Sequence, residues 1–118
     1  MEYRFKKQNE WENWLNDHFM SDEGISILFD KTKKTSTLTG EEALDVALRY
    51  GWIDGRINSI DQQYYLKYFK KRSTNSIWST KNKNRINELD ALGLMMPSGL
   101  KAVSLAKSDG RWDRGDQL

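Results

Sequence analysis

A dense group of polar residues surrounds one tryptophan in the second half of the chain. Its members are Ser76, Trp78, Ser79, Asn82 and Arg85, and a helix is predicted to begin at residues 79–80. The first turn of a helix offers free backbone N–H groups and a partial positive charge, which suit an anion. N-capping accounts for one serine but not for the whole group. The pattern therefore predicts an anion-binding site.

The polar group lies in a strongly basic segment. Residues 62–87 carry seven lysines and arginines, Lys71 and Arg72 among them, and no acid, whereas residues 1–30 carry three basic and seven acidic side chains. Tyr64 and other aromatic residues alternate with these cations. Such a mixture binds single-stranded nucleic acid when its rings are exposed, because cations follow the phosphates and rings stack on the bases. If the rings are buried, they are core residues, and the charge can balance the acidic N-terminal part.

Two aspartates bracket the first arm of a predicted hairpin. Asp54 and Asp61 could approach Arg56, Arg72 or Lys34. A carboxylate pair in a pocket can perform acid–base chemistry if the two pKa values are driven apart. The alternative is structural, because an aspartate at a turn commonly accepts hydrogen bonds from its own backbone and others form ion pairs.

Several kinds of active site lack their residues. His18 is the only histidine, and its place on the apolar face of a predicted helix indicates a core or boundary residue rather than a general base. The chain has no cysteine, no P-loop and no dinucleotide fingerprint, and its acids are too scattered for a metal site. We therefore expect no cofactor and no metal.

The composition also bears on location. Mean hydropathy is −0.83, and no apolar run approaches the ~18 residues of a membrane span. Residues 1–14 lack the apolar segment of a signal peptide. We expect no membrane insertion and a cytoplasmic protein.

Periodicity and stop signals divide the chain into helices and strands. The predicted helices span residues 9–19, 39–50, 79–92 and 97–109, and the predicted strands span 24–31, 52–60 and 63–71. Thr39 and Glu42 form a capping box, and Gly51 is placed for a left-handed cap. Residues 31–37 form a loop with three lysines, and the tail packs Trp112 and then frays. The elements predict one α+β domain over residues 1–118, with a small antiparallel sheet of about three strands packed with about four helices.

An ordered set of motifs resembles the YdeI/OmpD-associated proteins. The motifs are W-x-x-W-L at Trp11–Leu15, EALxxAL-x-x-GWIDG within residues 41–55, Asp61, Tyr64, Arg72, S-x-WSxxN at Ser76–Asn82, GLMxPxGLxAV at Gly93–Val103 and DGRW at Asp109–Trp112. The resemblance implies a bacterial protein of the kind labelled bacteriocin-protection or antimicrobial-stress. It supplies no catalytic residues. The motif positions it marks for a shared site are Trp52, Asp54, Asp61, Tyr64, Arg72, Ser76, Trp78, Ser79 and Asn82.

The chain departs from this family in two respects. Longer members continue into a second, helical region to which the protection label is most tied, so the label transfers weakly. Relatives often carry Cys-Phe where this chain has Arg49-Tyr50, and Pro-Arg where it has Lys71-Arg72. These changes add positive charge near the predicted site.

The residues favour a non-enzymatic binding domain for an anionic ligand, either a small molecule or an acidic peptide. Its predicted contacts beside Trp78 are Lys71, Arg72, Ser76, Ser79, Asn82 and Arg85. One alternative is nucleic-acid binding through residues 62–87, and another is an enzyme that uses Asp54 and Asp61. The ligand and the oligomeric state are left open.

Overall fold

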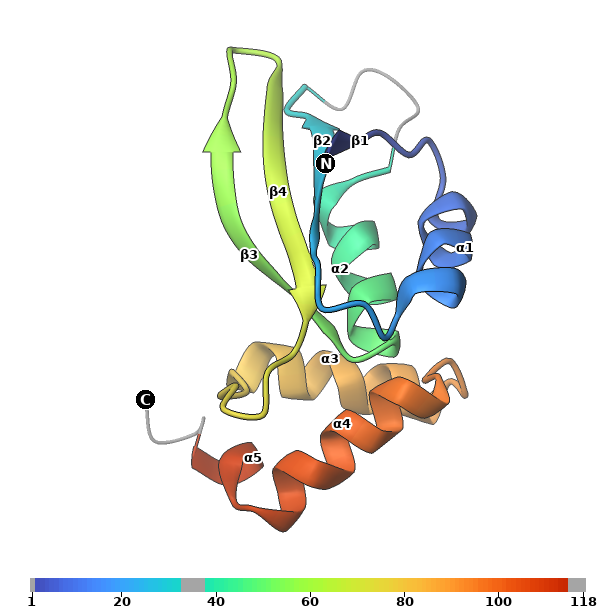
Figure 1. Cartoon of the computed structure of the whole chain (residues 1–118), viewed down its shortest axis with the longest axis vertical. Coiled ribbons are helices and arrows are strands. Elements are labelled where there is room, and N and C mark those ends of the chain that lie inside the picture. Colours follow the sequence, from blue (N-terminus) through green and yellow to red (C-terminus); the bar gives the residue numbers. More distant parts are fainter. Residues whose placement is uncertain (1, 33–37, 115–118) are drawn as a thin grey trace.

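The computed structural model describes residues 2–32 and 38–114, which form one compact α+β domain (Figure 1). Its elements are β1 (Glu2–Tyr3), α1 (Gln8–His18), β2 (Ile25–Asp30), α2 (Gly40–Arg49), β3 (Trp52–Ser59), β4 (Tyr64–Lys71), α3 (Thr80–Ala91), α4 (Pro97–Ser108) and α5 (Arg111–Arg114). The predicted class is confirmed. Most of the predicted lysine loop, with Lys34, and the end of the tail lie outside the described residues.

The described sheet has four strands rather than about three, in the order β1-β2-β4-β3. The β3–β4 hairpin and the β2–β4 pair are antiparallel, but β1 pairs parallel with β2, so the sheet is mixed. Five described helices replace the predicted four, because α5 follows α4. The two additions, β1 and α5, have two and four residues, too few for a periodic pattern to appear in the sequence.

One face of the sheet packs against α1 and α2 (Figure 1). Trp11 of α1 lies between Trp52 and Phe69, with ring centroids 6.2 and 5.5 Å away. The indole N–H of Trp11 donates to the carbonyl of Ala43, and that of Trp52 donates to the carbonyl of Phe19. Trp52 is thus a satisfied core residue, with no exposed surface to offer a ligand.

The prediction that His18 is a core or boundary residue was wrong. Its side chain is exposed at the end of α1, where the imidazole stacks on Trp14 at 4.3 Å and its Nδ1 lies 2.8 Å from the Trp14 carbonyl oxygen. Although His18 has the spacing of the apolar face, it falls in the last helical turn, where Trp14 covers the core in its place.

A second core lies where α3 and α4 cross the end of the sheet (Figure 1). Its buried residues come from α2, α3, α4 and the segments between β4 and α4, and are Leu48, Trp78, Ile86, Leu89, Met95, Val103 and Ala106. Trp112 packs on Trp78 with the ring centroids 5.2 Å apart, as predicted for the tail. The two cores meet at the end of α2.

The end of α2 brings α4 and β4 together. The capping box of Thr39 and Glu42 starts the helix, and Gly51, at φ +83°, turns the chain out of it, as predicted. The carbonyl of Gly51 then accepts a hydrogen bond from the backbone N–H of Arg72. On the other side, Gly99 of α4 rests against the carbonyl of Arg49, which leaves no room for a side chain.

No helix within residues 2–32 and 38–114 has the length and apolar character needed to cross a membrane.

Replacing Gly99 tests this close approach. In a helix, alanine is favoured over glycine by about 1 kcal/mol, but a methyl group at Gly99 would overlap the carbonyl oxygen of Arg49. We expect Gly99→Ala to lower the free energy of unfolding by about 1–3 kcal/mol in urea denaturation. Gly55→Ala is the matched control, because its added carbon would lie an ordinary 3.6 Å from Tyr68. Equal stability of the two variants would contradict the tight contact.

Candidate functional site

The residues predicted to form one polar cluster at the start of α3 have different partners in the structure. Ser79 is the N-cap of α3, and its hydroxyl accepts a hydrogen bond from the backbone N–H of Asn82. Arg85 lies further along the helix, where it forms two hydrogen bonds of 2.7 Å to Asp45 of α2 and one to Glu88. The hydrogen bonds to Asp45 raise the pKa of Arg85. Its donors therefore face carboxylates of the same domain and not the helix start.

The two candidate aspartates are far apart on the hairpin. Asp54 lies near the start of β3 and forms an ion pair of 2.7 Å with Lys67. Asp61 lies in the turn before β4, where it accepts hydrogen bonds from the backbone N–H groups of Tyr64 and Gln63, and these bonds lower its pKa. The carboxylates do not form a dyad, and each has the structural role that was the alternative to acid–base chemistry.

The aromatic residues of segment 62–87 are mostly packing residues. Phe69 and Trp78 are 0% and 1% exposed, and Tyr64, Tyr65 and Tyr68 are partly buried. Several cations of the segment form ion pairs with acids from other elements, namely Lys67, Lys71 and Arg85. This geometry offers little open ring surface for stacking on bases, so nucleic-acid binding stays a prediction that no contact favours.

Three of the predicted residues do converge. Arg72, which follows β4, donates from Nη1 to the hydroxyl of Ser76 at 2.8 Å, and its guanidinium lies 3.6 Å over the ring of Trp78. The side chain is buried, with 9% exposure. Its Nε and Nη2 atoms have no hydrogen-bond partner among the described residues. Arg72 is thus a buried cation with most of its donors uncommitted.

Burial sets the electrostatics of this cation. Desolvation lowers the pKa of Arg72 to about 10, an effect opposed by Asp54 and reinforced by the positive charge of Arg111. Asp54 is itself paired with Lys67. Arg72 therefore lacks the carboxylate partner that a buried guanidinium usually has.

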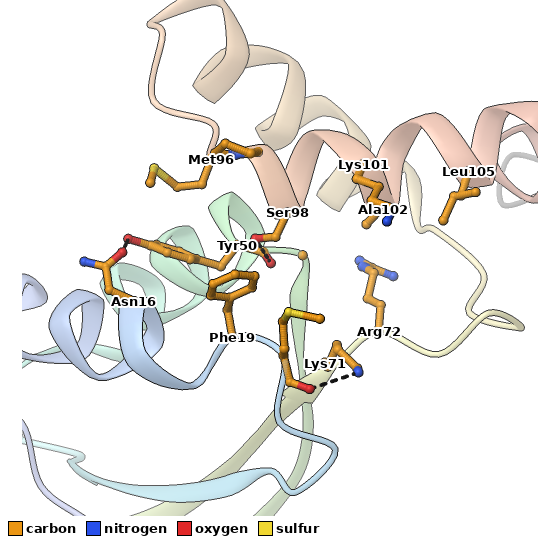
Figure 2. A pocket seen from close by; sticks show the side chains of 13 residues that line it. Asn16, Phe19, Tyr50, Lys71, Arg72, Met96, Ser98, Lys101, Ala102 and Leu105 are labelled. Atoms are coloured by element: carbon orange, nitrogen blue, oxygen red, sulfur yellow. Dashed lines mark hydrogen bonds between the residues drawn. The ribbon is translucent and has the colours of Figure 1, made fainter.

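Beside Arg72 lies a cavity of about 620 Å³ (Figure 2). It is bounded by the end of α1, the turn after α2, the end of β4, and α4 with the segment before it. Most of its lining is apolar. The lining residues are Asn16, Phe19, Met20, Tyr50, Gly51, Lys71, Arg72, Met96, Pro97, Ser98, Lys101, Ala102 and Leu105.

The charged groups of this cavity all have one sign. They are Lys71, Arg72 and Lys101, and the described lining includes no aspartate or glutamate. Lys71 also forms an ion pair of 2.9 Å with Asp22, which does not line the cavity. Its ammonium group donates a hydrogen bond to the carbonyl of Met20 (Figure 2). No ion pair joins Lys101 to another described residue. The cavity therefore combines an apolar wall with positive potential.

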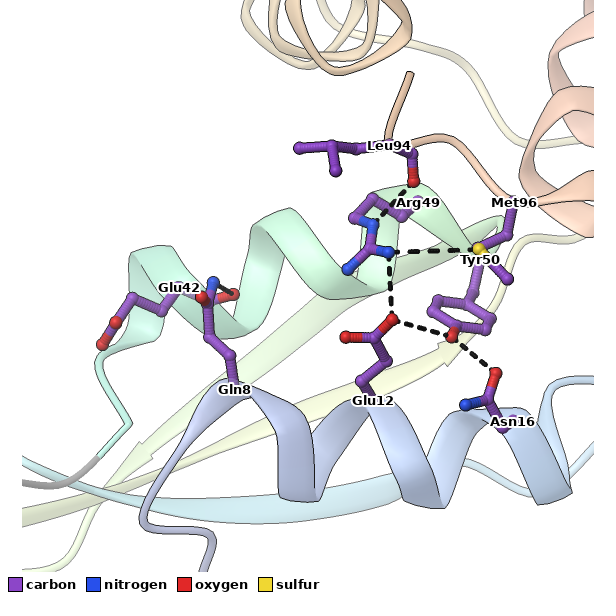
Figure 3. Close-up of polar contacts among 8 residues, drawn as sticks. All are labelled: Gln8, Glu12, Asn16, Glu42, Arg49, Tyr50, Leu94 and Met96. Atoms are coloured by element: carbon purple, nitrogen blue, oxygen red, sulfur yellow. Dashed lines mark hydrogen bonds and ion pairs between the residues drawn. The ribbon is translucent and has the colours of Figure 1, made fainter. Parts of the chain in front are cut away.

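A polar network includes three lining residues of the cavity, Asn16, Tyr50 and Met96 (Figure 3). The hydroxyl of Tyr50 donates to Asn16 at 2.6 Å and approaches Glu12, while Arg49 binds Glu12 and the carbonyl of Leu94. Burial and the nearby Glu12 charge raise the pKa of Tyr50, so the phenol stays neutral. The network fixes α1 and α2 to the chain that leads into α4.

A smaller cavity of about 70 Å³ also borders Arg72. It is bordered by Ser73, Thr74 and Arg111, and it shares Ala102 and Leu105 with the larger cavity. Arg111 is buried but well paired. Its side chain binds Asp109 at 2.7 Å and two carbonyl oxygens, those of Ser73 and Ser76.

Sequence reasoning found Lys71 and Arg72 but missed the rest of the cavity. Asn16, Tyr50 and Lys101 come from three distant segments, and no motif links them. The one usable signal was Pro97, because a proline is favoured in the first turn of a helix and here marks the start of α4. Gly99, two residues later, is the position at which α4 touches the end of α2 in the structure.

Fold and cavity together define a small α+β domain with a cationic, ligand-sized cavity. Residues 3–102 match the model of the family described as "Domain of unknown function (DUF8412)". The match covers most of the chain, so the protein belongs to this family. Searches of curated proteins and of solved structures gave no match. Nothing in these findings links the chain to the YdeI/OmpD-associated proteins, and that resemblance stays a prediction.

The cost of burying Arg72 can be measured. The fall of the Arg72 pKa from its usual range to about 10 corresponds to a penalty on the order of 3 kcal/mol for the charged form. Methionine has similar length, carries no charge and can pack on Trp78. After loss of the Ser76 hydrogen bond and the ring contact, we expect Arg72→Met to stabilise the domain by about 1–2 kcal/mol, seen as a higher Tm.

Arg111→Met is the matched control, since both arginines are buried. This change removes an ion pair and leaves two carbonyl groups without their donor, so we expect a loss of about 1–3 kcal/mol. If Arg72→Met lowered the Tm as Arg111→Met does, Arg72 would be a structural residue.

Proposed function

We propose that this protein is a non-enzymatic binding domain that holds a small amphipathic anion in the larger cavity. The observation that carries the proposal is the lining: an apolar wall whose charged groups, among the described residues, are three cations and no acid. An apolar ligand body would gain from leaving water. An anionic head would be attracted by Arg72 and Lys101, which form no ion pair with another described residue, whereas Lys71 is paired with Asp22.

The size of the cavity supports a small-molecule ligand. Its volume of about 620 Å³ falls in the usual range of roughly 300–1,000 Å³ for ligand pockets. Met20 and Leu105 line it and are 73% and 48% exposed. A ligand body that covered these side chains would bury apolar surface worth about 25 cal/mol per Å². An acidic peptide, the other predicted ligand, would need an extended groove, whereas this cavity has the volume of a small-molecule pocket.

The lining also favours binding over catalysis. The described residues around the cavity include no histidine, cysteine or carboxylate that could activate a nucleophile or exchange a proton near neutral pH. The hydroxyl of Ser98 donates to the carbonyl of Tyr50 at 2.8 Å, and the phenol of Tyr50 donates to Asn16. Both hydroxyls thus hold the cavity wall together.

The physiological setting is a separate matter. The resemblance to the YdeI/OmpD-associated proteins would place such binding in a bacterial stress or antimicrobial-protection response. That setting stays a prediction, and the cavity supports only the binding of an anion.

Calorimetric titration with octanoate and 1-octanol tests the proposal, because the two ligands share an apolar chain and differ in charge. We expect octanoate to bind at least about tenfold more tightly than the alcohol, a difference of roughly 1.4 kcal/mol. Lys101→Glu should weaken octanoate binding about two- to fivefold, the modest effect of an exposed charge.

The matched control for this titration is Lys81→Glu, which makes the same charge change on α3, away from the cavity lining. It should leave octanoate affinity unchanged. Equal binding of acid and alcohol, or equal effects of the two substitutions, would refute the anion site. Tight binding of a single-stranded oligonucleotide with a steep salt dependence would instead favour the nucleic-acid alternative.

A further inference from the structure

The free donors of Arg72 lie along one edge of its guanidinium. Nη1 is occupied by the hydroxyl of Ser76, whereas Nε and Nη2 have no partner within the described chain. Nε–H and the adjacent Nη2–H point the same way from the planar group. This edge forms two parallel hydrogen bonds with a carboxylate or phosphate in bidentate pairs.

The position of Arg72 makes this edge part of a binding site. Arg72, Ala102 and Leu105 border both the larger and the smaller cavity. In Figure 2 the guanidinium extends from the end of β4 toward the part of α4 that carries Ala102 and Leu105. The face of the guanidinium is fixed by Trp78, 3.6 Å away. The group is therefore held in one plane at the border that the two cavities share.

We infer that the ligand is a monocarboxylate whose head forms a bidentate pair with the Nε–Nη2 edge of Arg72, while its apolar tail lies in the larger cavity. This inference rests on the proposed function and specifies its ligand class and the residue that selects it. The smaller cavity, of about 70 Å³, shares Arg72 with the larger one and gives the head group space.

A carboxylate fits this site better than a phosphate ester. It is planar, carries one charge, and matches one guanidinium edge. A phosphate monoester carries close to two charges and three terminal oxygens, which need further donors. The nearby Arg111 has committed its Nε to Asp109 and its Nη1 to the carbonyls of Ser73 and Ser76. Within the described chain, only its Nη2 is left to add to the Arg72 edge, which is fewer donors than a phosphate monoester needs.

A carboxylate can reach this edge only after a neighbouring side chain has moved. The Nε and Nη2 atoms are closed to solvent, and Leu105 borders both cavities while being 48% exposed. Its half-exposed side chain can turn toward solvent without breaking a hydrogen bond. The carboxylate then enters between α4 and the end of β4.

The test compares octanoate, octyl phosphate and 1-octanol on the intact chain and on Arg72→Lys and Arg72→Met. Lysine keeps the charge but cannot form the bidentate pair, so we expect Arg72→Lys to lose at least about tenfold in octanoate affinity. Arg72→Met should bind octanoate no better than octanol. Thermal melts establish that both variants are folded.

A direct readout is the side-chain Nε–H signal of Arg72 in ¹⁵N NMR spectra, assigned by its loss in Arg72→Lys. It should shift on addition of octanoate and not of octanol. Wild-type affinity in Arg72→Lys together with an unmoved Nε–H signal would overturn the inference, and so would tighter binding of octyl phosphate. If octanoate still bound and Lys101→Glu still weakened it, the proposed function would stand without this contact. Absence of octanoate binding to the unmodified protein would remove both.

Discussion

Three successive carbonyl groups at the end of α2 organise the molecule. The last carbonyls of a helix have no partner within the helix, and here they are taken by two segments, the start of α4 and the residue that follows β4. The carbonyl of Arg49 accepts from the backbone N–H of Met96, that of Tyr50 from the hydroxyl of Ser98, and that of Gly51 from the backbone N–H of Arg72. These bonds attach α4 and the end of β4 to α2.

The cavity follows from this arrangement. Gly99 lets α4 touch the end of α2 at its first turn, while Arg72 leaves the sheet on the other side of Gly51. The two segments diverge from a common point, so the space between them is not filled by either core. The end of α1 closes that space through the contact of Asn16 with Tyr50. A wall built by backbone hydrogen bonds is rigid, which suits a site that must recognise shape.

Much of the fold could be predicted because its signals are local. The capping box at Thr39, the left-handed turn at Gly51 and the hairpin turn at Asp61 each depend on residues within four positions of one another. The short β1 and α5 gave no such signal. Both are held by contacts that cross the chain, as when Glu2 pairs with Ser26.

The candidate site was harder to predict because its contacts join distant segments. Ser79 and Arg85 are close in sequence, yet the helical turn between them points Arg85 at Asp45 on a neighbouring helix. Arg72 and Trp78 were predicted to lie at the site, and they meet, but as a stacked pair beneath α4 rather than as part of a helix start. The charges and aromatic rings could be counted in the sequence. Which cation stays without a carboxylate partner could not be predicted, because it depends on contacts such as that of Arg85 on α3 with Asp45 on α2.

The unpaired charge has a consequence for binding strength. A surface arginine must lose its hydration when a ligand arrives, and that loss subtracts from affinity. Arg72 has already been desolvated by folding, since Trp78 and α4 cover it before any ligand is present. The cost of desolvating the guanidinium therefore lowers the stability of the free domain. An anion that reaches the guanidinium gains an electrostatic attraction that water does not screen. Trp78 belongs to the second core and also stacks on the guanidinium, so an aromatic residue of segment 62–87 that serves packing also holds this cation in place.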